Sequence, residues 1–133
     1  MAFLIILEAL GSAMSNISVE LASIFISIKD RITSRLPVGH SFIPLELMVT
    51  VIANSNTDKL KVSELFDLLP YSNIGIRYHY KTLVEDGWFD ISECSNDRRV
   101  KYVQPSEKLT NTFTLLGNEI LENSFFNKTK NRI

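Results

Sequence analysis

The sequence predicts a mainly α-helical domain that carries one small β-hairpin, an α+β fold. Apolar residues recur at spacings of three and four over most of the chain, as they do along one face of a helix. Two short runs rich in aromatic and β-branched residues, Trp88–Ser92 and Val100–Gln104, flank a polar turn, as in a hairpin. At 133 residues, we expect a single domain spanning residues 1–133.

The first element is a long helix over residues 1–36, either continuous or interrupted near Gly11-Ser12, and stopped by Pro37. Its N-terminal run is too short for a membrane span and contains Glu8, so we expect neither a signal peptide nor a membrane anchor. We expect this helix to bury its apolar surface against a second chain instead. Its apolar stripe consists of Ile17, Leu21, Ile24, Phe25, Ile28 and Ile32.

Two shorter helices follow, separated by a polar connector at residues 54–58. Ser41 is placed to cap the first of them. Its apolar stripe consists of Leu45, Met48, Val49 and Ile52. The second ends before Pro70. Its stripe consists of Val62, Leu65, Phe66 and Leu69.

The next helix is predicted over residues 72–86, with Ser72 as its N-cap and Gly87 as its C-terminal stop. One face is apolar and is expected to face the core: Ile76, Tyr80, Leu83 and Val84. The opposite face contains no acidic residue before Glu85 and presents Asn73, Ile74, Arg77, Tyr78 and Lys81.

A final helix is predicted from Ser106 to about Asn127, followed by a polar, basic tail. Its apolar stripe consists of Leu109, Phe113, Leu116 and Ile120. The turn of the preceding hairpin holds Asp97, Arg98 and Arg99, and two adjacent arginines are more than a turn requires. We therefore expect the arginines to contact a polyanion, with Asp97 orienting one of them.

Composition excludes several classes of function. The formal net charge is −1, which argues against coating nucleic acid by bulk attraction but not against a local basic surface. The single cysteine, Cys94, excludes an internal disulfide and fits a reducing compartment. His40 and His79 are isolated, and no catalytic motif is present. We therefore predict no catalytic residues, no metal site, no cofactor and no enzymatic activity.

The order of helix, short helix, tight turn, helix and hairpin is that of a winged helix-turn-helix. In this arrangement the third helix enters the major groove of DNA and the hairpin lies beside it. The predicted contacts of the recognition helix are Ser72, Asn73, Ile74, Arg77, Tyr78 and Lys81. Those of the hairpin, or wing, are Asp97, Arg98, Arg99 and Lys101.

The run from about Lys61 to Leu109 resembles the MarR (multiple-antibiotic-resistance regulator) family of winged-helix repressors. Leu83 and Gly87 match that family's helix end, and Asp97 and Arg99 match its Asp-x-Arg wing motif. The junction into the last helix departs from the family, with Pro105 in place of Leu and Leu109 in place of Gly. The resemblance implies a dimer in which the flanking helices, 1–36 and 106–133, pair around a DNA-binding lobe at 41–105.

The sequence thus predicts a cytoplasmic regulator of transcription that binds double-stranded DNA. The resemblance implies that it is a dimeric repressor, and a two-fold dimer would bind a pseudo-palindromic operator. The predicted dimer interface consists of Ile17, Leu21, Ile24, Phe25, Ile28, Phe113 and Ile120. The resemblance also implies a small-molecule effector, for which no residues can be assigned. Two alternatives stay open: a winged-helix module that docks a protein without binding DNA, and a plasmid-maintenance or replication factor.

Overall fold

The computed structural model describes the backbone of residues 2–56 and 58–123, and the side chains of residues 16–56 and 58–122. The elements, in chain order, are α1 (Ala2–Arg35), α2 (Ile43–Ala53), β1 (Leu60–Lys61), α3 (Val62–Asp67), α4 (Asn73–Glu85), β2 (Phe89–Glu93), β3 (Lys101–Pro105) and α5 (Glu107–Asn123). The predicted fold class, mainly helical with a winged helix arrangement, is confirmed.

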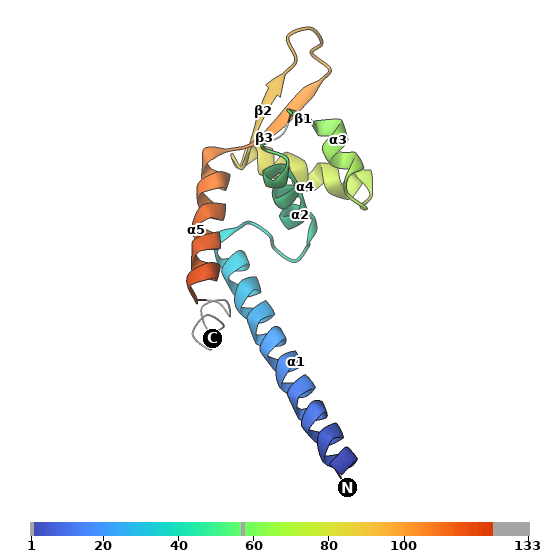
Figure 1. Ribbon diagram of the computed structural model, residues 1–133. Coiled ribbons are helices and arrows are strands. Elements are labelled where there is room, and N and C mark those ends of the chain that lie inside the picture. Colours follow the sequence, from blue (N-terminus) through green and yellow to red (C-terminus); the bar gives the residue numbers. More distant parts are fainter. Residues whose placement is uncertain (1, 57, 124–133) are drawn as a thin grey trace.

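Helices α2, α3 and α4 and the small sheet form a lobe, from which the β2–β3 hairpin projects (Figure 1). Helix α1 extends away from the lobe in the opposite direction, and α5 lies beside its C-terminal part. Helix α1 runs without a break through Gly11-Ser12, so the alternative of an interrupted helix is wrong. None of the helices, as far as the chain is described, is long and apolar enough to cross a membrane.

The sheet has three antiparallel strands in the order β1-β3-β2. The predicted hairpin is confirmed: Phe89 pairs with Pro105 and Ile91 with Val103. Strand β1 was not predicted. Its Leu60 also pairs with Val103, on the other edge of β3. This extra strand ties the start of α3 to the base of the wing.

The core lies where α2, α4, α5 and the sheet meet. Its fully buried side chains include Leu47, Leu65, Ile76, Val103 and Leu109. Each such side chain stabilises the fold by about 1.5–3 kcal/mol relative to leaving it exposed. Because these residues come from α2, α3, α4, β3 and α5, they fix the position of α4 relative to the wing.

The start of α2 differs in detail from the prediction. Phe42, not Ser41, is the N-cap residue and makes no side-chain capping bond. The Ser41 hydroxyl instead accepts a hydrogen bond from the Ile43 N–H (3.2 Å). Pro44 in the first turn accounts for the change, because proline has no N–H that needs a cap.

The junction between β3 and α5 is tightly bonded despite its departure from the MarR pattern. The N–H of Ser106 donates to the Trp88 carbonyl (3.1 Å), and its hydroxyl accepts from the Leu109 N–H (3.1 Å). Lys108 donates its ammonium group to the Asp86 carbonyl (3.1 Å). The start of α5 is therefore fixed to the end of α4. The remainder of the predicted last helix and the basic tail, residues 124–133, lie outside the described residues.

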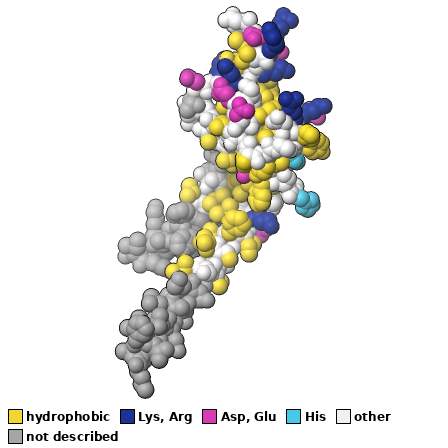
Figure 2. Space-filling model, turned by 90° about the vertical axis from the view of Figure 1, so that its right-hand side faces the viewer, with side chains coloured by type: hydrophobic (Ala, Val, Ile, Leu, Met, Phe, Trp, Pro, Cys, Tyr) yellow, Lys and Arg dark blue, Asp and Glu magenta, His cyan; other side chains and the backbone are white. Residues whose placement is uncertain are grey.

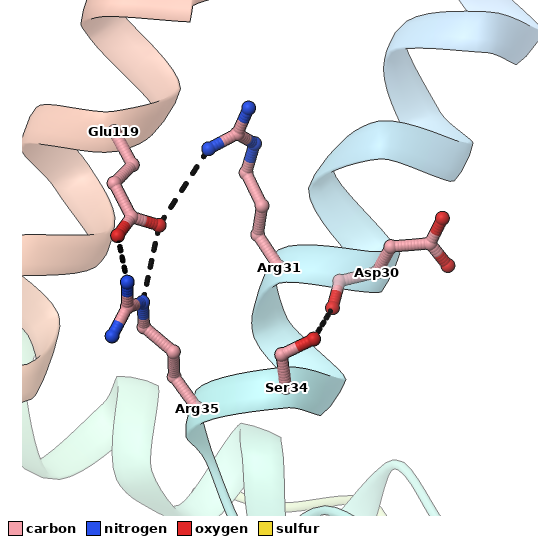
Figure 3. Close-up of polar contacts among 5 residues, drawn as sticks. All are labelled: Asp30, Arg31, Ser34, Arg35 and Glu119. Atoms are coloured by element: carbon pink, nitrogen blue, oxygen red, sulfur yellow. Dashed lines mark hydrogen bonds and ion pairs between the residues drawn. The ribbon is translucent and has the colours of Figure 1, made fainter.

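An ion-pair cluster joins α5 to α1 (Figure 3). Arg35 makes a two-pronged contact with Glu119, in which its Nε donates to Oε2 at 3.1 Å and its Nη2 bonds Oε1. Arg31 Nη1 lies 3.6 Å from the same Oε2. One carboxylate on α5 thus holds two arginines that are one turn apart on α1.

Candidate nucleic-acid interface

The recognition-helix candidate, α4, begins and ends where the sequence predicts. Ser72 is the N-cap, in an extended conformation, and its hydroxyl accepts from the Gly75 N–H (3.4 Å). At the other end Gly87 adopts a φ of 82°, a left-handed conformation that favours glycine. Ile76 and Leu83 are buried and hold the inner face of α4 against the core. The helix therefore has a defined outer face.

All six predicted contact residues of the recognition helix are exposed: Ser72, Asn73, Ile74, Arg77, Tyr78 and Lys81. The first turn of α4 contains no acidic residue, so the positive end of the helix dipole is not neutralised there. Lys81 lies 3.9 Å from Glu85, and this largely exposed pair contributes little to stability. The outer face is therefore cationic toward its middle and open to a partner.

The wing turn is organised by Asp97. Its Oδ1 accepts a hydrogen bond from the Arg99 N–H (3.0 Å) and lies 3.6 Å from Arg99 Nε. The orienting role that the sequence predicts for Asp97 therefore has a geometric basis. The Arg99 side chain is 94% exposed, and Arg98 and Lys101 are also exposed. The turn thus presents cations at its tip without burying them.

A hollow of about 530 Å³ separates α4 from the wing. Its charged lining comes from both elements, with Arg77, Lys81 and Glu85 from α4 and Lys101 from β3, so three cations face one acid. Its floor is apolar and consists of Val62, Phe66, Tyr80, Val84 and Ile91. In the space-filling view, most Lys and Arg side chains that can be seen lie over the upper part of the molecule, around the wing and lobe, with Asp and Glu side chains among them (Figure 2). The two predicted contact regions therefore share one side of the lobe.

The residues of the predicted dimer interface fall into two groups. On α1, Ile17, Leu21 and Phe25 are 64%, 66% and 62% exposed, whereas Ile24 and Ile28 are half-buried. On α5, Phe113 and Ile120 are half-buried against the core of their own chain. Phe113 and Ile120 thus pack against the core of the monomer, whereas the exposed apolar residues of α1 are free to contact a second chain.

Among the described residues, the environment shifts the pKa of three groups. Hydrogen bonds from the backbone N–H groups of Asn96 and then Asp97 lower the pKa of the Cys94 thiol, with a smaller contribution from Tyr102. Burial raises the pKa of Tyr80. Desolvation and then a hydrogen bond with Glu46 raise that of Tyr71. Cys94 is the only one of these in the wing, next to the proposed contacts.

Two features of this region were not predicted from the sequence. Lys108 lies over the Trp88 ring, 4.1 Å from its centroid, and so links α5 to the base of the wing. Glu119 binds Arg31 and Arg35, which are 88 and 84 residues away in the chain. The i, i+4 spacing of the two arginines was a visible signal for an acidic partner, but it did not say which acid.

In the described part of the chain, no His, Cys, Asp and Glu side chains form a group that could hold a metal ion.

Comparisons of the sequence with protein-family models and with curated proteins found no match. Solved structures do match. A MepR mutant from S. aureus bound to an oligodeoxyribonucleotide superposes with a TM-score of 0.61 at 9% identity, over 90% of this chain and 89% of that one. Reduced AbfR bound to DNA gives 0.55 at 11% identity, over 99% and 92%.

A structure described as a MarR-like transcription regulator from Bacillus cereus gives a TM-score of 0.53 at 15% identity, over 84% of this chain and 79% of that one. YusO from Bacillus subtilis gives 0.58 at 17% identity, over 84% and 80%. At these identities the likeness is one of fold. The lobe, the wing and the two flanking helices together give this chain the winged-helix fold of MarR-like proteins.

Proposed function

We propose that the protein is a dimeric, sequence-specific, double-stranded DNA-binding regulator of transcription that acts as a repressor. The observation that carries this proposal is the hollow between α4 and the wing, where Arg77, Lys81 and Lys101 converge from two elements. Cations that converge on one surface favour a polyanionic partner. The exposed α4 face has the shape to enter a major groove.

Each element has a distinct part in this proposal. Residues of α4 contact base edges in the major groove, where each base pair presents its own pattern of donors and acceptors. Arg98 and Arg99 at the wing tip contact phosphates or the minor groove, which supplies affinity more than sequence information. Asp97 binds the Arg99 backbone N–H and lies 3.6 Å from Arg99 Nε, so it favours a guanidinium position at the wing tip.

Dimerisation is proposed through the helices of residues 1–36 and 106–133, around the DNA-binding lobe of residues 41–105. Exposed Ile17, Leu21 and Phe25 support it, because apolar stripes of this kind are usually covered by a partner. A two-fold dimer requires a pseudo-palindromic operator, and its half-site centres would be about 10 base pairs apart. MepR and AbfR, whose structures were solved with nucleic acid, share this fold.

The protein would act in the cytoplasm, without enzymatic activity or cofactor, and any small-molecule effector would act on DNA binding. One alternative is favoured by a specific observation. Ile74 and Tyr78 are 85% and 69% exposed on the outer face of α4, and apolar surface also suits a protein partner. Binding to a plasmid or replication origin would use the same DNA contacts and would differ in the site recognised.

The decisive experiment is selection of bound sequences from random duplex DNA, followed by titration of the enriched duplex and of a scrambled one. We expect enrichment of a pseudo-palindrome. Inserting five base pairs between its halves should nearly abolish binding, because it rotates one half to the far side of the duplex. The absence of any enriched sequence would overturn the proposal and favour the protein-docking alternative. Unchanged affinity for the spaced site would overturn the dimeric mode of binding.

A further inference from the structure

Ile74 is 85% exposed, more than any other large hydrophobic residue among the described side chains. It is the second residue of α4, in the first turn. Single exposed hydrophobic residues are common and need no explanation. This one differs in its neighbours, because Arg77, Tyr78 and Lys81 follow it at helical spacings of three, four and seven and are exposed as well. Ile74 therefore begins a stripe that is partly apolar and partly cationic.

The charges around this stripe limit what can cover it. Arg77 and Lys81 line the same hollow as Lys101 of the wing, where Glu85 at the far end of α4 is the one acid among the lining residues. The first turn of α4, where Ile74 lies, contains no acid. A surface of this charge favours a polyanion over a second copy of the chain, whose own stripe would bring like charges together. The partner must then offer an apolar group within an anionic frame. In the major groove of DNA, the C5-methyl group of thymine is such a group.

We propose that Ile74 reads the methyl group of a thymine in each half-site. The inference rests on the proposed function and assigns a specific base contact within it. The N-terminal residues of a recognition helix are those that approach base edges most closely, and Ile74 occupies that position. Arg77, one turn further on, is then placed for the neighbouring base pair or its phosphate. The bound sequence therefore contains an A·T pair that is recognised by burial of a methyl group and not by a hydrogen bond.

Replacing thymine by uracil tests this directly, because uracil keeps the hydrogen-bonding edge and lacks only the methyl group. In the selected duplex, each thymine is replaced by uracil in turn, and the dissociation constant is measured by fluorescence anisotropy. At one position per half-site, we expect binding to weaken about fourfold. Burial of one methyl group is worth a little more than half the free energy of a tenfold change in affinity.

Variants of Ile74 assign the effect to this side chain. Ile74→Ala should bind the thymine and uracil duplexes equally, and Ile74→Val should retain part of the discrimination. Neither should unfold the protein, because the side chain is exposed and alanine favours helix. Val49→Ala, which removes an exposed apolar side chain of α2, is the matched control and should keep the full fourfold difference. The dependence of affinity on salt should not change in Ile74→Ala, because no charge is removed.

The inference is overturned if uracil is tolerated at every position by the parent protein, or if Ile74→Ala still discriminates thymine from uracil as the parent does. Either result would leave the proposed function intact, because a selected duplex must exist for the test to be made. Failure to select any duplex would overturn both, and the stripe would then be a protein-docking surface.

Discussion

The ammonium group of Lys108 lies 4.1 Å from the centroid of the Trp88 ring, so a cation in the first turn of α5 covers the only tryptophan of the chain. The same ammonium group donates to the Asp86 carbonyl at the C-terminus of α4. Lys108 therefore joins α5 to the end of the proposed recognition helix and to the start of the wing.

Lys108→Ala should lower the free energy of unfolding by about 1 kcal/mol, because it removes a cation–π contact and a charge-assisted bond at a helix C-terminus. Tryptophan fluorescence should change in the native state, since Trp88 is its only source. Urea unfolding of the variant and the parent, followed by both fluorescence and circular dichroism, measures this. Lys108→Met keeps much of the packing on the Trp88 ring, so its free energy of unfolding should lie between those of Lys108→Ala and the parent. A parent-like emission spectrum in Lys108→Ala would contradict the contact.

Phe25→Glu should dissociate the proposed dimer. Phe25 is 62% exposed on α1, where a charged residue costs nothing in the monomer but would be buried and unpaired in a dimer interface. Analytical ultracentrifugation at micromolar concentration should give a dimer for the parent and a monomer or aggregate for the variant. Lys29→Gln, a polar replacement one turn along the same helix, is the control and should remain a dimer. A well-behaved monomer for the parent would refute the proposed interface.

Arg99→Ala should weaken binding to the selected duplex and to random DNA by similar factors, because phosphate and minor-groove contacts carry little sequence information. The salt dependence of binding should decrease by about one phosphate contact. Asp97→Ala should give a milder form of this defect, since it frees the Arg99 guanidinium without removing its charge. Titration of both duplexes at several salt concentrations measures these effects.

Arg77→Ala provides the contrast to this wing variant. It should cost more on the selected duplex than on random DNA, by about 1–3 kcal/mol if the guanidinium pairs with guanine. If Arg99→Ala binds both duplexes as the parent does, the wing arginines are solvated and contact no DNA.

Cys94 should react with iodoacetamide faster than an ordinary thiol near neutral pH. Hydrogen bonds from the backbone N–H groups of Asn96 and Asp97 stabilise the thiolate and lower its pKa, so the inflection of the rate–pH profile should lie below that of a free cysteine. Rates measured on the folded protein and on the same protein in urea give the comparison. Tyr102→Phe, which removes a smaller contribution, should raise the inflection slightly. Identical profiles in the two states would contradict this prediction.

The ends of α4 were predictable because local residues determine them. Ser72 caps the helix and Gly87 adopts the left-handed conformation that follows it, and both effects act within a few residues. The exposure of Arg77 and Lys81 followed from helical periodicity alone. The contact between Asp97 and Arg99 was likewise predictable, because the carboxylate accepts a hydrogen bond from an N–H only two positions along the chain.

Features that depend on tertiary contacts were not predictable. Strand β1 has only two residues, too few to show a period, and exists because Leu60 and Lys61 meet the free edge of β3. The sequence left open whether the first helix is interrupted near Gly11, and it is not, since a glycine costs a helix only about 1 kcal/mol, which 34 residues of continuous helix can offset. Glu119 could not be predicted as the partner of Arg31 and Arg35, because that prediction requires knowing how α5 packs against α1.

Helix α1 is one long helix that is attached to the lobe only at its C-terminal end, so a small rotation there moves its other end a long way. Its 34 residues extend about 51 Å, so a rotation of about 10° at the lobe end would displace the far end by about 9 Å. Successive major grooves on one side of a duplex are about 34 Å apart, so such a displacement is about a quarter of the spacing that the two lobes of the proposed dimer would have to match. Two contacts fix the orientation of α1 at this attachment point: the burial of Leu36 and Val38, and the hydrogen bonds of Arg35 to Glu119. In the proposed dimer, small substitutions there should therefore change the distance between the two DNA-binding lobes more than they change the stability of the fold.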